Sequence, residues 1–269
     1  MTRRPRTLMM KSIFLRSLYD KRWFMLGWSL ALSLMAVLMI AMYPSLHEGM
    51  KNIAASMPPQ LQGLVGDISL FGHLDTYLSS QLYDIRIPLF LMIMAVVLAQ
   101  GLSVNSEEKG EMRTILSTAT SRSSLFFQTG VAAVVIFMTA ITITSLVTWL
   151  GVPMIDESID TWLVIKLGVL SLAFAMTVFS IVYAVGSATG SRSITLSVGV
   201  GLIILSVILE AGRTVDWLDL AQKVSMLHYY DAGKLLTTGI ELKHLLVQGV
   251  LFSASWLVGW LLFRRRDIS

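Results

Sequence analysis

Long apolar runs alternate with short polar segments along the whole chain. Six of these runs reach or approach the roughly 20 residues that an α-helix needs to cross a hydrocarbon core of about 30 Å. They cover residues 23–43, 87–105, 125–150, 162–186, 193–210 and 244–263. Apolar residues follow one another in these runs and do not alternate with polar residues, which excludes a membrane β-barrel. Because backbone amides must be hydrogen-bonded within lipid, the pattern predicts an all-α polytopic membrane protein with six transmembrane helices.

Composition supports a membrane protein and excludes several kinds of chemistry. Hydrophobic residues make up 55% of the 269 residues and charged residues only 14%, whereas soluble proteins carry about 25% charged residues. The chain has no Cys, so disulfides and thiolate metal sites are excluded. It has no Gly-x-x-x-x-Gly-Lys-[Ser/Thr] phosphate loop, so we expect neither an ATP site nor an enzyme. We expect no metal site from the scattered histidines His47, His73, His228 and His244.

The distribution of Lys and Arg predicts the orientation of the spans. With the N-terminus inside, the inner segments hold fourteen of these residues and the outer segments seven. The acidic residues Asp156, Glu157 and Asp160 stand in an outer loop that carries no basic residue. The positive-inside rule therefore places both termini in the cytoplasm, as in a multi-pass protein of the plasma membrane.

Residues 1–22 carry seven basic residues ahead of the first span. Within them, an apolar face of Met10, Ile13, Phe14 and Leu18 opposes the polar residues Lys11, Arg16 and Asp20. This pattern predicts a cytoplasmic amphipathic helix on an anionic membrane surface, and a generic positively charged anchor is the alternative. The first apolar run is too long for the core of a cleavable signal peptide, so we interpret it as an uncleaved span.

A polar segment, residues 106–124, separates the second and third spans. Ser106 is a candidate N-cap, and Met112, Ile115 and Leu116 form an apolar stripe at helical spacing. The segment therefore predicts one or two short amphipathic helices at the cytoplasmic membrane surface. An ordinary solvated loop is the alternative.

The same segment resembles a known family. Glu-Glu-Lys-Gly, an apolar stripe and Ser-Thr-x-x-Ser-Arg follow one another in Glu107–Arg122, and this order resembles the segment after the second span in permeases of type-2 ATP-binding-cassette (ABC) exporters. The family often has a Pro where Ala119 and Thr120 stand here. The resemblance implies a coupling helix that docks into a cleft of a separate cytoplasmic ATPase. The residues that would make this contact are Glu107, Glu108, Lys109, Gly110, Glu111, Arg113, Ile115, Leu116, Ser121 and Arg122.

The resemblance also implies the assembly and the domain organisation. Residues 1–22 would be a connecting helix and residues 23–269 a six-span permease domain. Two permease copies, or this chain and a similar subunit, would pair with two ATPases in a lipid membrane. ATP and Mg would bind the ATPases, so this chain would hold no cofactor, and nucleic acid is not an expected partner.

Two outer segments, residues 44–86 and 211–243, join the spans on the external side. Pro44 opens the first segment, in which Leu74, Tyr77, Leu78 and Leu82 predict a helix lying on the membrane surface. For the second segment, the resemblance implies a re-entrant helical hairpin over the outer mouth. An interfacial loop with an aromatic belt is the alternative.

Polar residues inside the spans are candidates for lining a pathway, because burial in lipid is costly unless they have a role. The candidates are Thr142, Ser145, Thr148, Gln100 and Gln128. Hydrogen bonds to carbonyls of the same helix, or to a neighbouring helix, are the alternative explanation for the hydroxyls. The sequence predicts an exporter permease first, then a non-transporting scaffold or sensor subunit bound to an ABC ATPase. A membrane-embedded lipid-modifying enzyme is the third hypothesis.

Overall fold

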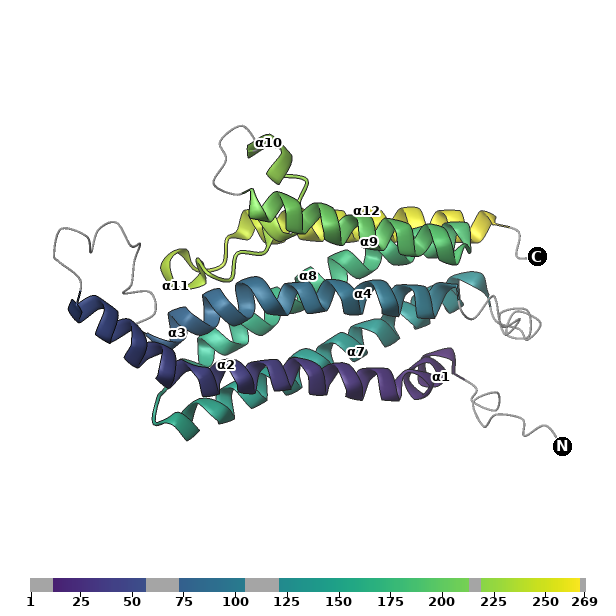
Figure 1. Cartoon of the computed structure of the whole chain (residues 1–269). Coiled ribbons are helices and arrows are strands. Elements are labelled where there is room, and N and C mark those ends of the chain that lie inside the picture. Colours follow the sequence, from purple (N-terminus) through teal and green to yellow (C-terminus); the bar gives the residue numbers. More distant parts are fainter. Residues whose placement is uncertain (1–11, 57–72, 105–120, 213–218, 267–269) are drawn as a thin grey trace.

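The computed structural model describes residues 12–56, 73–104, 121–212 and 219–266 (Figure 1). All regular secondary structure in these residues is helical, and six helices are long and apolar enough to cross a membrane. These spans are Arg22–Gly49, Leu74–Ser103, Arg122–Ile155, Thr161–Thr189, Arg192–Ala211 and Leu242–Arg265. The prediction of an all-α protein with six candidate spans is therefore confirmed.

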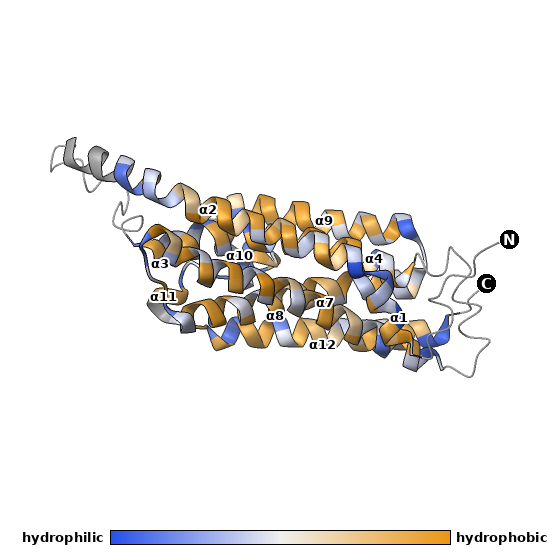
Figure 2. Ribbon diagram, turned by 90° about the horizontal axis from the view of Figure 1, so that it is seen from below, coloured by the Kyte–Doolittle hydropathy of each residue, from blue (hydrophilic) through white to orange (hydrophobic). Residues whose placement is uncertain are grey.

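Helix α8 (Thr161–Thr189) occupies the centre of the bundle. It packs against α4 (Ile87–Ser103), α7 (Arg122–Gly151), α9 (Arg192–Ala211) and α12 (Leu242–Arg265). Helix α2 (Arg22–Ser56) packs mainly along α7. The ribbon coloured by hydropathy shows apolar helices throughout, with hydrophilic residues concentrated toward the helix ends (Figure 2).

Glycines allow the helices to approach closely at several crossings. A Cβ atom at Gly259 of α12 would lie 2.8 Å from the Cα atom of Ala184 in α8. A Cβ atom at Gly186 would lie 2.3 Å from the Ser103 hydroxyl oxygen, and one at Gly199 would lie 2.6 Å from the Val96 side chain. Small residues at such contacts are typical of helix packing in membranes, where close approach gives the van der Waals contact that holds helices together.

The second span begins earlier than the sequence predicted. Helix α3 (Leu74–Tyr77), the π-helix η3 (Leu78–Arg86) and α4 follow one another without a break. Leu74, Tyr77, Leu78 and Leu82 are buried within the bundle, so the prediction of a surface-lying helix here is wrong. Helical apolar spacing shows that a face is covered, but protein and lipid can both cover it.

The first span also ends later than predicted. Helix α2 continues through Pro44 to Ser56, so Pro44 does not open a loop. A proline inside a membrane helix removes one backbone hydrogen bond and is tolerated there. At about 1.5 Å per residue, the 35 residues of α2 exceed the thickness of a hydrocarbon core of about 30 Å. One end of α2 therefore extends beyond the apolar layer.

Caps and turns set the ends of the central helices. Asp160 caps α8 by accepting a hydrogen bond from the Trp162 amide at 3.0 Å, and Gly190 ends α8 at φ 61°. Ser191 then caps α9 by accepting from the Ile194 amide. A tight turn at Gly190 thus joins α8 to α9, since glycine adopts positive φ without steric cost. Asp156, also at positive φ, follows η4 (Val152–Ile155) in the connection between α7 and α8.

Candidate functional site

Of the predicted coupling segment, residues 106–124, the structure describes only residues 121–124, at the start of α7. Glu107, Glu108, Lys109, Gly110, Glu111, Arg113, Ile115 and Leu116 lie outside the described residues. Ser121 is the N-cap of α7, and its hydroxyl accepts a hydrogen bond from the Ser124 amide at 3.1 Å. The Arg122 guanidinium donates to the carbonyls of Arg264, at 3.4 Å, and Arg266. The start of the third span is therefore joined to the end of the sixth.

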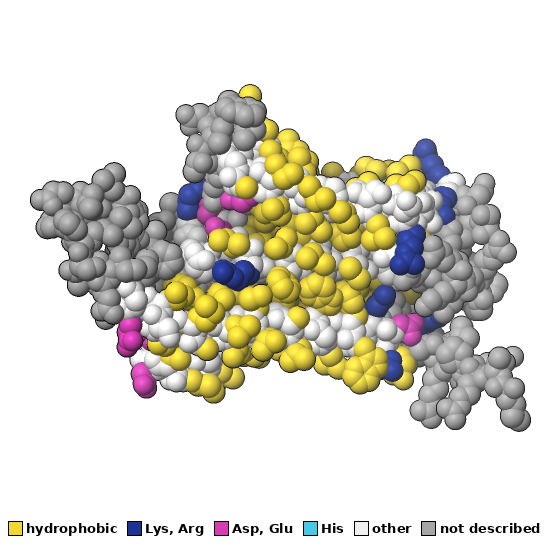
Figure 3. Space-filling view, in the orientation of Figure 1, with side chains coloured by type: hydrophobic (Ala, Val, Ile, Leu, Met, Phe, Trp, Pro, Cys, Tyr) yellow, Lys and Arg dark blue, Asp and Glu magenta, His cyan; other side chains and the backbone are white. Residues whose placement is uncertain are grey.

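Basic side chains gather at this end of the bundle. The first turn of α7, the turn between α8 and α9, and the end of α12 carry Arg122, Arg192, Arg264 and Arg265. The carbonyls at the end of α12 form the negative pole of the helix dipole, so nearby guanidinium groups are favoured. Arg266 continues this arrangement by donating to the carbonyl of Ser187 in α8 at 3.2 Å. We call this the basic end; it lies on the right in Figures 1 and 3.

Helix α1 (Ile13–Asp20) packs against α7 at the basic end. The Phe14 amide donates to the side-chain oxygen of Gln128 at 3.1 Å, so Gln128 attaches α1 to α7. Its role in lining a pathway stays a prediction. Arg16 is buried and forms an ion pair with Asp20 at 3.6 Å. A helix is therefore present here, and the Arg16 side chain is covered by the bundle. Contact of α1 with a membrane surface stays a prediction.

Two further pathway candidates are enclosed by neighbouring helices. Gln100 of α4 is buried, and its amide nitrogen has no hydrogen-bond partner within the described part of the chain. Thr148 is fully buried; its hydroxyl donates to the Thr144 carbonyl at 3.0 Å and lies 3.4 Å from the Tyr83 hydroxyl. At about 100° per residue, six residues turn Thr148 about 240° away from Thr142. The alternative explanation, helix and interhelix hydrogen bonding, is thus correct for Thr148.

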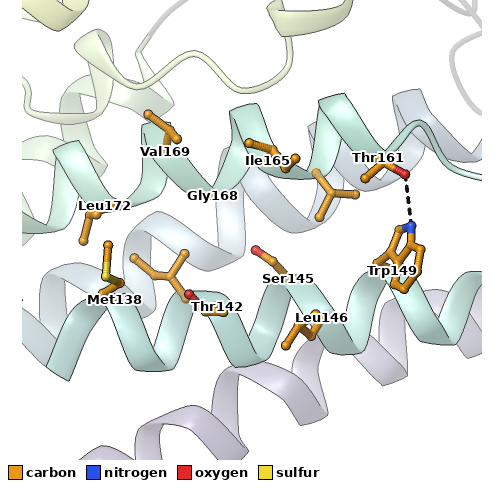
Figure 4. A pocket seen from close by; sticks show the side chains of 12 residues that line it. Met138, Thr142, Ser145, Leu146, Trp149, Thr161, Ile165, Gly168, Val169 and Leu172 are labelled. Carbon is orange, nitrogen blue, oxygen red and sulfur yellow. Dashed lines mark hydrogen bonds between the residues drawn. The ribbon is translucent and has the colours of Figure 1, made fainter. Parts of the chain in front are cut away.

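Thr142 and Ser145 line a groove between α7 and α8. The groove has a volume of about 450 Å³ and is almost entirely apolar. Figure 4 shows Thr142 and Ser145 on α7 opposite Ile165, Gly168 and Val169 on α8. The other lining residues are Met138, Ile141, Leu146, Trp149, Thr161, Val164 and Leu172. The groove lies on the outer face of the two helices, since Met138, Leu146, Ile165 and Val169 are about half exposed.

The opposite end of the bundle is closed by the segment between α9 and α12. Its described part carries the short helices α10 (Asp219–Gln222), η6 (Leu227–Tyr229) and α11 (Leu235–Thr238). The re-entrant helical hairpin that the resemblance implies stays a prediction, because residues 213–218 of this segment lie outside the described residues. Tyr230, Ala232 and Leu235 are buried, so part of the segment enters the bundle. Because several acidic residues lie at this end, including Glu48, Asp156, Glu157 and Asp160, we call it the acidic end.

Polar side chains from four spans hold this segment. The Asp84 carboxylate, from η3, accepts hydrogen bonds from the amides of Ala232 at 2.9 Å and Gly233 at 3.2 Å. Gln248 of α12 donates to the Tyr229 carbonyl at 2.7 Å. Ser206 of α9 accepts from the Met226 amide at 3.2 Å. We call the stretch from Tyr229 to Leu235, in which Tyr230, Ala232 and Leu235 are buried, the inserted segment.

The fourth contact joins the hydroxyls of Tyr230 and Ser171, which lie 2.9 Å apart. Burial raises the pKa of the Tyr230 hydroxyl, and the nearby Asp84 carboxylate acts in the same direction. Tyr230 therefore stays neutral and can donate its proton to a hydrogen bond.

Sequence reasoning missed Asp84, because it was assigned to an external segment in which a charged residue needs no explanation. The available signal was its position: Asp84 stands two residues before Arg86 and three before the predicted start of the second span. A charge so close to an apolar run is costly unless it is paired.

No model of a known protein family matches the chain, and no curated protein matches it either. Among the described residues, no group of three or more His, Cys, Asp or Glu side chains is placed to hold a metal ion.

Proposed function

We propose that this chain is the membrane permease subunit of a type-2 ABC exporter. The observation that carries the proposal is the order of residues in Glu107–Arg122, which resembles the coupling segment of that family. Its position supports the proposal, because it joins the second and third of six candidate spans. A separate ATPase would bind ATP and Mg, and this chain would transmit the resulting movement to its spans as a two-state element.

The arrangement of the basic end supports the same function. Helix α1, the end of α4, the start of α7 and the end of α12 lie together there (Figure 1). With the basic end in the cytoplasm, as the positive-inside rule favours, a segment joining α4 to α7 would face a cytoplasmic ATPase. Through Arg122, movement of that segment would act directly on the end of α12.

Co-purification with an ATPase tests the proposal. A tagged chain extracted gently from its native membrane should bring down a nucleotide-binding subunit. Glu108→Lys should reduce the bound subunit about tenfold, which corresponds to about 1.4 kcal/mol of binding free energy. Gly110→Trp should have a similar effect, because a bulky side chain would obstruct docking into a cleft.

Glu157→Lys is the matched control, because it makes the same charge reversal at an exposed position of the acidic end. This variant should keep the bound subunit. The proposal fails if no nucleotide-binding subunit accompanies the folded protein, or if Glu108→Lys binds one as well as the control does. ATPase activity that is unaffected by any transported compound would favour a scaffold or sensor subunit instead.

A further inference from the structure

The groove between α7 and α8 has the shape and polarity of a lipid-binding site. We propose that it holds one acyl chain of a membrane phospholipid, from the leaflet at the acidic end. This binding site is independent of the proposed transport function. It would exist whether the chain is a permease or a scaffold.

The length of the groove matches half of a bilayer. Its lining residues on α7 run from Met138 to Trp149, and those on α8 from Thr161 to Leu172. Each stretch covers 11 steps along its helix, which at about 1.5 Å per residue is roughly 16 Å. Half of a hydrocarbon core of about 30 Å is roughly 15 Å, the depth that an acyl chain of one leaflet occupies.

The polarity of the groove changes from one end to the other. At the acidic end, the Trp149 indole nitrogen donates to the Thr161 hydroxyl at 3.1 Å (Figure 4). Tryptophan is typical of the membrane–water interface, so this end is placed at the level of lipid headgroups. The other end is lined by Met138 and Leu172, which are apolar. A phospholipid would thus lie with its headgroup near Trp149 and its chain along the groove.

Gly168 of α8 faces Ser145 of α7 across the groove (Figure 4). A Cβ atom at Gly168 would lie 3.3 Å from the Ser145 hydroxyl oxygen and 3.7 Å from the Ile141 side chain. Even a methyl group at position 168 would press against the Ser145 hydroxyl. A larger residue there would take up space between the two walls and obstruct the groove.

A lipid fits this groove better than a second copy of the chain does. In their most apolar stretches, 44% of α7 and 72% of α8 are buried within the bundle, against 22% of α9 and 11% of α12. A second copy would find more uncovered apolar surface on α9 and α12 than on the walls of the groove. The groove also runs along the helices, in the direction that lipid chains take in a bilayer.

Photo-crosslinking in lipid bilayers tests the proposal. The full-length protein is placed in nanodiscs containing a trace of phosphatidylcholine that carries a diazirine on one acyl chain. After irradiation, the crosslinked positions are mapped by peptide mass spectrometry. We expect the label to be concentrated on residues 138–149 and 161–172, in excess of the exposed faces of α9 and α12.

Gly168→Leu should abolish the crosslinks within the groove. Gly201→Leu is the matched control: Gly201 is exposed on α9, and a Cβ atom there would meet no atom within 4 Å. The control should label as the wild type does. The map of the wild-type protein tests the proposal even if Gly168→Leu does not fold.

Two results would overturn the proposal. Label spread evenly over all lipid-facing helices, and unchanged by Gly168→Leu, would show ordinary contact with surrounding lipid. The second result uses Ser145→Cys, which introduces a single thiol into a chain that has none. If this variant forms a disulfide-linked dimer and the groove carries no label, a second copy covers the groove.

Discussion

The two ends of the bundle are held together in different ways. At the basic end, the contacts lie near the surface: Arg122 and Arg266 donate to backbone carbonyls where helices terminate. At the acidic end, the inserted segment lies partly inside the bundle, and Asp84 and Gln248 bond to its backbone. Hydrogen bonds contribute more where water cannot replace a lost partner. We therefore expect the acidic end to be the more sensitive to single substitutions.

The largest effect is expected from Asp84→Ala. This change leaves the amides of the buried Ala232 and the half-buried Gly233 without their acceptor. Hydrogen bonds to a charged group contribute about 1.5–3 kcal/mol each, so we expect a loss of about 3 kcal/mol in the free energy of unfolding. Thermal unfolding in detergent measures it. Asp84→Asn keeps an acceptor oxygen and should lose much less; equal losses would show that the hydrogen bonds are not the cause.

An intermediate effect is expected from Gly190→Ala at the basic end. Gly190 has φ 61°, and the Arg266 guanidinium lies where a Cβ atom would be. A left-handed conformation costs about 1–2 kcal/mol for a residue other than glycine, so we expect a loss of that size. Gly201 is an exposed residue in the middle of α9. Gly201→Ala should instead raise the free energy of unfolding by about 0.5–1 kcal/mol, because alanine favours a helix more than glycine does. The same melting experiment compares the two, and equal shifts would contradict a role for the positive φ.

The smallest effect is expected from Arg122→Gln. The side chain loses its donation to the carbonyls at the end of α12, where water can replace it. We expect a loss of about 0.5–1 kcal/mol, typical of a cation at a helix C-terminus. Melting at low and high salt should show a smaller difference from the wild type at high salt. If Arg122→Gln lowered the free energy of unfolding as much as Asp84→Ala, the acidic end would not be the more sensitive of the two ends.

The spans could be predicted from the sequence because hydropathy over about 20 residues is a property of the segment alone. The start of the second span could not be predicted in this way. The apolar side chains of Leu74, Tyr77 and Leu78 would suit a membrane surface as well as a protein interior. The expected loop at Pro44 was wrong for a related reason. A proline ends many helices in water but is tolerated inside a membrane helix, so its effect depends on the environment of the helix.

The candidate site was predictable only in part. Spacing placed Thr142 and Ser145 on one face of the third span, and both line the groove. No spacing rule within one helix could show that Gly168 stands opposite Ser145, because that depends on how α7 and α8 pack. Asp84 and its contacts with Ala232 and Gly233 bring together residues nearly 150 positions apart.

The π-helix η3 makes the exact number of residues in the second span important. At about 100° of rotation per residue in an α-helix, removing one residue between Leu78 and Arg86 would rotate one half of the span against the other by more than a quarter turn. Either Asp84 would then face away from Ala232, or Leu91 and Leu98 would leave the core that they fill. Related chains should thus accept insertions and deletions in their connecting loops far more readily than in this apolar stretch.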